Sequence, residues 1–133
     1  MTDDIIGLDI SKDRLDAFRN ADRASAVFAN DAPGIARLAR WIGRRPARVV
    51  FEATGRYHLQ LERQLDAAGH GLVKVNPRQA KRFGEALGVQ AKTDRMDARM
   101  LARMGAALGL EPAPVRPQSL REINALVVAR RAL

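Results

Sequence analysis

The 133-residue chain contains no cysteine, which excludes disulfide bonds and thiolate metal sites and is typical of proteins in a reducing cytosol. Histidine is scarce, and the two isolated residues, His58 and His70, are not expected to bind a metal. No apolar run is long enough to cross a membrane. The sequence begins Thr2-Asp3-Asp4, unlike the basic start of a signal peptide. We therefore expect a cytoplasmic protein with no membrane partner.

Acidic residues are outnumbered by basic ones. The 15 Asp and Glu residues face 23 Lys and Arg residues, which gives a formal net charge of +8 and a pI of about 11.1. Arginine carries most of this charge, and its planar guanidinium group suits phosphate. Nucleic acid is therefore the first partner to consider. An arginine-rich proteome is the alternative explanation.

The order of apolar segments predicts one α/β domain. Residues 5–11, 14–19 and 25–29 are typical of strands, and their short connections predict an antiparallel meander. Helices then alternate with strands, and right-handed crossovers make the later strands parallel to the first. We predict a mixed five-stranded sheet with helices on both faces. The later elements are expected as a helix after 30–34, a strand at 48–53, a helix before 69, a strand at 72–77, a helix at 77–87 and a helix from 93.

The C-terminal part has a different composition. Residues 111–117 are rich in proline and predict a stiff linker. Ser119 and Glu122 match a capping box at the start of a further helix that has an apolar face. We expect a catalytic domain at 1–110, followed at 111–133 by the linker and the start of a helical, coiled-coil segment. This last helix is either truncated or pairs with another subunit, which predicts a homo-oligomer.

The segment 91–102 (AKTDRMDARMLA) places two acids at a helix start. Thr93 is the expected N-cap, and Asp94 and Asp97 lie on one face of the first turn, at the positive end of the helix dipole. These acids head the apolar face, so we expect them to meet other acids and a cation inside the protein. The alternative is that they only stabilise the dipole. The expected apolar face continues through Ala98, Leu101, Gly105 and Leu108.

Two more acids lie where this topology can bring them close. Asp9 interrupts the first strand, and Glu52 ends the fourth. Open α/β sheets place their sites at the carboxyl ends of such strands. Carboxylates about 4 Å apart repel by roughly 4 kcal/mol at an effective dielectric near 20, which favours protonation or a bound cation. Oxygen ligands favour Mg²⁺, with Mn²⁺ as a substitute. Two such ions stabilise the attacking and leaving oxygens of phosphodiester displacement.

Several basic residues near these acids are expected to contact nucleic acid. Arg95, Arg99 and Arg103 form a stripe at four-residue intervals on the last helix of the domain. Lys92 precedes that helix, and Arg56 follows the strand that ends at Glu52. The alternative for each is a solvent-exposed surface or loop residue.

Four segments in order along the chain resemble the N-terminal domain of the DEDD transposases. This insertion-sequence family includes the Piv pilin-gene inverting recombinase. The resemblance covers about residues 5–110, and 120–133 resemble the start of the family's coiled-coil region. The segments are 7–12 (GLDISK), 51–57 (FEATGRY), 75–77 (VNP) and 91–98 (AKTDRMDA).

The resemblance implies a ribonuclease-H-like (RuvC-like) fold of the Holliday-junction-resolvase type, with Asp9, Glu52, Asp94 and Asp97 as a metal-binding catalytic tetrad. It implies metal-dependent DNA strand cleavage and transfer during transposition, directed in some members by a non-coding bridge RNA. Family members continue into a second domain with a serine implicated as nucleophile. None of the serines here lies in a matching motif, so we expect a domain that is incomplete for recombination. The serines are Ser11, Ser25 and Ser119.

Other functions fit parts of the sequence. The domain can be a module that binds DNA or guide RNA without catalysis, or a stand-alone nuclease of the Holliday-junction type. An ATPase of the sugar-kinase and actin type also carries an aspartate in its first strand. Against the ATPase, the chain has no second glycine loop for a nucleotide and is too short for two lobes.

Overall fold

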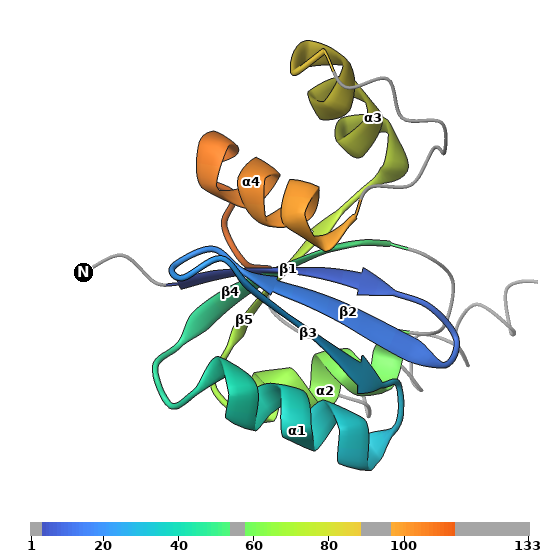
Figure 1. The fold of residues 1–133 in the computed structure, drawn as a ribbon, viewed down its shortest axis with the longest axis vertical. Helices are drawn as coiled ribbons and strands as arrows, with labels where there is room; N and C mark the ends of the chain where they lie inside the picture. The colour runs from blue at the N-terminus through green and yellow to red at the C-terminus, as the bar shows by residue number, and fades with distance from the viewer. Residues whose placement is uncertain (1–3, 54–57, 89–96, 114–133) are drawn as a thin grey trace, which may run out of the picture.

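The structure, a computed structural model, describes residues 4–53, 58–88 and 97–113. Its centre is a five-stranded sheet with the strand order β3-β2-β1-β4-β5 (Figure 1). The elements are β1 (Asp4–Ile10), β2 (Arg14–Arg19), β3 (Ala24–Ala29), α1 (Ala32–Ile42), β4 (Ala47–Glu52), α2 (Leu59–Ala67), β5 (Gly71–Val75), α3 (Pro77–Ala86) and α4 (Ala98–Leu108).

The sheet is mixed, as predicted. Strands β1, β2 and β3 pair antiparallel, whereas β4 pairs parallel to β1 and β5 pairs parallel to β4. Helices α1 and α2 cover one face, and α4 lies on the other with α3 beside it (Figure 1). The predicted meander, parallel crossovers and helices on both faces are therefore confirmed.

Alternation along β1 divides the core into two layers. Ile6, Leu8 and Ile10 pack in the layer under α1 and α2, while Ile5 packs in the layer under α4. Gly7 also lies on the α4 side, because side chains two residues apart share a face. A Cβ atom on Gly7 would overlap the carbonyl oxygen of Ala98, so the helix backbone rests directly on this strand. The glycine in the middle of β1 thus fixes the position of α4.

The two helices that carry a proline in their first turn, α1 and α3, begin where the sequence predicts. Asp31 caps α1, and its carboxylate accepts a hydrogen bond of 2.7 Å from the backbone N–H of Gly34. Asn76 caps α3 in a reciprocal capping box with Gln79. Each cap satisfies backbone donors that have no partner within the helix.

The last helix begins later than predicted. Asp97 is the N-cap of α4, with extended backbone angles (φ −78°, ψ 170°), so it does not lie in the first turn of a helix that starts after Thr93. Its carboxylate accepts a hydrogen bond of 2.8 Å from the N–H of Met100, which explains why the helix starts here. Thr93 and Asp94 lie outside the described residues.

The apolar face of α4 is confirmed at Ala98, Leu101 and Gly105, but the prediction for Leu108 is wrong. Leu108 is 54% exposed. Gly105 already lies close to Ile5, near the start of β1. Three further residues carry the helix about 4.5 Å onward, which takes Leu108 past the end of the strand.

The end of the described chain packs against the sheet edge. The N–H of Ala113 donates a 3.1 Å hydrogen bond to the carbonyl of Leu72 on β5, and Arg48 donates one of 2.9 Å to the carbonyl of Leu110. The predicted helix at 119–133 lies outside the described residues, so that helix and the domain boundary stay predictions. No helix in the described part of the chain is long and apolar enough to span a membrane.

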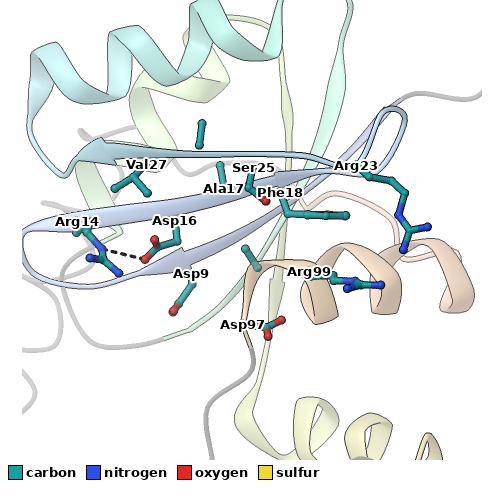
Figure 2. Close-up of a pocket in the computed structure, with 12 residues that line it drawn as sticks. Asp9, Arg14, Asp16, Ala17, Phe18, Arg23, Ser25, Val27, Asp97 and Arg99 are labelled. Carbon is teal, nitrogen blue, oxygen red and sulfur yellow. Dashed lines mark hydrogen bonds and ion pairs between the residues drawn. The ribbon is translucent and has the colours of Figure 1, made fainter.

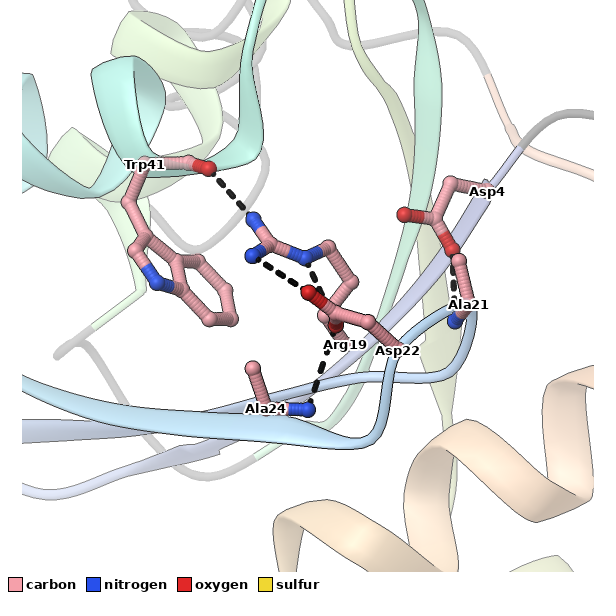
Figure 3. Close-up of polar contacts among 6 residues, drawn as sticks. All are labelled: Asp4, Arg19, Ala21, Asp22, Ala24 and Trp41. Carbon is pink, nitrogen blue, oxygen red and sulfur yellow. Dashed lines mark hydrogen bonds and ion pairs between the residues drawn. The ribbon is translucent and has the colours of Figure 1, made fainter.

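An arginine joins the β2–β3 hairpin to α1 (Figure 3). Arg19 donates a 2.6 Å hydrogen bond to the carbonyl of Trp41, and its guanidinium carbon lies 4.3 Å from the centre of the Trp41 ring. Two further hydrogen bonds of 2.9 Å connect it to both carboxylate oxygens of Asp22. These bonds from Arg19, followed by the bond from the N–H of Ala24, lower the pKa of Asp22 from 3.8 to about 2.

We expect this pair to make stability depend on acid pH. A carboxyl group with a lowered pKa in the folded state stabilises the protein above pH 3.8, and this contribution is lost as the pH falls through about 2. Asp22→Asn should lower the urea midpoint at pH 5, but only slightly, since the pair is exposed. Between pH 4 and pH 2, the urea midpoint of Asp22→Asn should fall less than that of wild type. Urea unfolding at several pH values, with Asp13→Asn as the control, measures this. Identical pH profiles for wild type and Asp22→Asn would contradict it.

Candidate functional site

Two of the predicted site acids line one pocket. Asp9 lies near the end of β1, two residues after Gly7 and on the same side of the sheet. Because Ala98 rests on Gly7, Asp97 at the start of α4 is brought to the same side as Asp9 (Figure 2). Both carboxylates line a pocket of about 570 Å³ between the sheet and α4.

The strand register brings Glu52 to the same end of the sheet. Leu8 pairs with Phe51 in the parallel ladder, so the next residues along the two strands are Asp9 and Glu52. Glu52 shares a face with Val50, which packs under α4. Glu52 is 7% exposed and does not line the pocket itself. Burial of an acid beside another acid is costly unless a partner offsets its charge.

The structure thus places three of the four proposed acids in one region, which does not test their proposed role. Asp9, Glu52 and Asp97 lie on the α4 side at one end of the sheet, and Asp94 lies outside the described residues. Within 4–53, 58–88 and 97–113, no three His, Asp or Glu side chains are close enough together to hold a metal ion. The all-oxygen donor set fits Mg²⁺ or Mn²⁺ in its chemistry. The four-acid site itself stays a prediction.

The capping hydrogen bond uses only part of the acceptor capacity of the Asp97 carboxylate. Its Oδ1 atom accepts the hydrogen bond from Met100, and the side chain is exposed. A carboxylate has about four acceptor positions, so its other oxygen keeps the capacity to bind a cation. The N-cap position also fixes the carboxylate at the pocket wall.

A third pocket acid was not predicted. Asp16 on β2 lies directly opposite Asp9 in the antiparallel register and lines the same pocket. Arg14 Nε lies 3.1 Å from Asp16 Oδ2 and offsets its charge (Figure 2). The missed signal was the two-residue turn at Lys12-Asp13, which fixes the register of the hairpin and therefore the partner of Asp9.

The predicted basic residues are distributed unevenly. Arg99 lines the pocket, whereas Arg103 is exposed on the next turn of α4 and does not line it. Arg23, in the turn between β2 and β3, also lines the pocket and was not predicted. The remaining predicted contacts, Arg56, Lys92 and Arg95, lie outside the described residues.

Another buried acid belongs to the opposite face. Glu62 of α2 is 4% exposed, and its Oε1 atom forms a 2.8 Å ion pair with Nζ of Lys74. The Nε2 atom of His58 lies 3.7 Å from the same oxygen. Its neighbours Leu61 and Leu65 pack in the layer under α1 and α2. Glu62 is therefore separated from Asp9 by the sheet, and we assign it a role in the fold.

The second histidine is part of the core. The Nδ1 atom of His70 accepts a 3.1 Å hydrogen bond from the N–H of Ala47, and burial lowers the pKa of His70. It therefore serves as a neutral hydrogen-bond acceptor at the start of β4. His70 does not line the pocket.

The fold is that of the ribonuclease-H-like, RuvC-like proteins. The structure of Thermus thermophilus RuvC matches with a TM-score of 0.55 and 16% identity, over 83% of this chain and 99% of that one. The T. thermophilus RuvC in complex with a Holliday junction substrate matches with a TM-score of 0.54 and 15% identity, over 84% of this chain and all of that one. At this level of identity the likeness establishes the fold alone.

The chain belongs to the transposase family of the DEDD IS110 type, whose model matches residues 6–133. It is 33% identical over 132 residues to the pilin gene-inverting protein of Moraxella bovis, and 32% identical to that of Moraxella lacunata. Each alignment covers 93% of this chain and 40% of the relative. The chain thus spans less than half the length of these relatives. The family resemblance stated from the motifs is confirmed.

Proposed function

We propose that this chain is the catalytic domain of a transposase or recombinase that cleaves and transfers DNA strands at phosphodiester bonds. The observation that carries the proposal is the approach of Asp9 and Asp97 to one pocket from two different elements. Glu52 supports it, since the register places this buried acid beside Asp9. Family membership supports the same class of activity. The RuvC-like fold is compatible with it.

In this proposal the acids hold divalent cations and the basic surface holds DNA. Asp9, Glu52 and Asp97, together with Asp94, would hold these cations. Bound Mg²⁺ would supply charge stabilisation for the attacking and leaving oxygens of the phosphate. The basic residues of the pocket would position the phosphate, and Arg14 would balance the charge of Asp16.

The test is a calorimetric titration with Mn²⁺. Asp9→Asn should weaken binding by about tenfold or more relative to wild type, because it removes a charged ligand of the proposed site and the loss of even an outer-shell partner has an effect of that size. Asp13→Asn is the matched control, since Asp13 is an exposed acid in the adjacent turn and should bind like wild type. Equal affinity in wild type and Asp9→Asn would contradict the proposed site.

A second candidate is a nucleic-acid-binding domain that performs no chemistry by itself. The observation in its favour is that three site acids in the described residues do not form a metal cluster among themselves. Salt-sensitive DNA binding without cleavage in Mg²⁺ would support it. A bridge-RNA partner, a homo-oligomer formed through 119–133 and a cytoplasmic location also stay predictions.

A further inference from the structure

The pocket that contains Asp9 and Asp97 has a second, basic end. Arg23 reaches it from the β2–β3 turn and Arg99 from the first turn of α4 (Figure 2). Both side chains are exposed, and within the described residues neither is paired with a carboxylate. Two guanidinium groups at one pocket wall attract an anion.

Arg23 occupies a backbone conformation that does not suit arginine. Its φ of +60° is left-handed, which glycine or asparagine adopts at lower cost. The turn is already held by Asp22, which bonds to Arg19 and to the N–H of Ala24. The fold therefore does not explain an arginine at this position.

Arg99 also lies where local structure disfavours it. It is the second residue of α4, at the positive end of the helix dipole, where a cation is destabilising. Arg23 is thus disfavoured by its backbone conformation and Arg99 by the helix dipole, and both line one pocket. Such exceptions are expected where a residue serves binding and not folding.

The register gives the distance between the two ends of the pocket. Asp9 pairs with Asp16, and Ile6, three positions back, pairs with Arg19 just before the turn that holds Arg23. Three strand residues span about 10 Å. Among the pocket residues of β3, Ser25 lies between the two ends, opposite Phe18, and Val27 lies at the acidic end, opposite Asp16.

We propose that Arg23 and Arg99 bind a phosphate of the DNA strand about 10 Å from the phosphate held at the acidic end. This inference rests on the proposed function, because it takes that strand as the ligand. It adds a position-specific contact to the general attraction of a basic protein for DNA. The contact fixes how far the strand extends along β2 and β3 before it meets the acids.

The test measures affinity for a branched DNA by fluorescence anisotropy, with Ca²⁺ in place of Mg²⁺, in Arg23→Asn and Arg99→Gln. Each should raise the Kd about fivefold or more and reduce the slope of log K against log salt by about one. The urea midpoint of Arg23→Asn should stay unchanged or rise, because asparagine tolerates the left-handed turn. Arg37→Gln, an exposed arginine of α1 on the opposite face, is the charge-matched control and should change the Kd less than twofold.

Different results would overturn the phosphate contact and the proposed function. Equal weakening by Arg23→Asn and Arg37→Gln would show that net charge alone binds the DNA and would overturn the inference. Unchanged affinity with a lower urea midpoint would assign Arg23 to the fold and overturn it as well. DNA binding by wild type that is absent or unaffected by salt would overturn the proposed function itself.

Discussion

Replacing Gly7 with alanine is expected to lower the free energy of unfolding by about 3 kcal/mol or more, which is the upper end of the usual range for substitutions that overpack a core. A methyl group on Gly7 would overlap the backbone carbonyl of Ala98, and no side-chain rotation can relieve this contact. Helix α4 must therefore move off β1, which separates Leu101 and Met104 from their buried layer. Urea unfolding measures the loss. Mn²⁺ binding should weaken in the same variant, because Asp97 moves with the helix.

Gly109→Ala provides the control at the other end of α4. Gly109 is left-handed (φ 57°) and has open space around it, so alanine there costs only about 1–2 kcal/mol of backbone strain. It should leave Mn²⁺ binding unchanged. Should Gly7→Ala be no more destabilising than Gly109→Ala, the direct contact between α4 and β1 would be wrong.

The fold could be predicted from the sequence because its signals are local. The apolar run of β1, the alternation along β2 and the caps at Asp31 and Asn76 each depend on a few neighbouring residues. The parallel arrangement of β1 and β4 follows from the handedness of the crossover. These two steps are enough to bring Asp9 beside Glu52, which is the part of the candidate site that the sequence best predicts.

The start of α4 could not be predicted because two residues compete for the cap. Thr93 and Asp97 are both good N-caps, and they are four residues apart. The contact between Ala98 and Gly7 links the helix start to a strand 91 positions earlier in the chain, a relation that no local pattern contains. The change matters for function, because a capping Asp97 has a fixed place at the pocket wall.

The acid and arginine that the sequence analysis missed depend on strand register. Asp16 was indistinguishable from other polar residues of an alternating strand until its pairing with Asp9 was known. Arg23 belongs to no motif in the sequence, and its left-handed backbone is not encoded by its residue type. Both errors come from treating turns as connections only, although a turn decides which side chains meet.

Glu52→Gln is expected to reduce DNA strand cleavage in Mg²⁺ on the order of 10³-fold, because metal stabilisation of the reacting oxygens amounts to several kcal/mol and each 1.36 kcal/mol is tenfold. Glutamine keeps the shape of this buried side chain and removes its charge. Without metal, the urea midpoint should stay unchanged or rise, since repulsion with Asp9 is relieved. Cleavage of a branched DNA, followed on denaturing gels, measures the first effect.

Thermal unfolding with and without Mn²⁺ separates a metal site from a structural acid. A free Mn²⁺ concentration of 100 times the wild-type Kd should stabilise wild type by about 2.7 kcal/mol and stabilise Glu52→Gln far less. Glu85→Gln is the matched control, because Glu85 is an exposed acid on α3 and should behave like wild type in both assays. A structural Glu52 would give the opposite pattern, in which Glu52→Gln is less stable without metal and gains as much from Mn²⁺ as wild type. Joint loss of cleavage and of Mn²⁺ stabilisation, with the apo fold intact, is the combination that only a metal-binding catalytic acid produces.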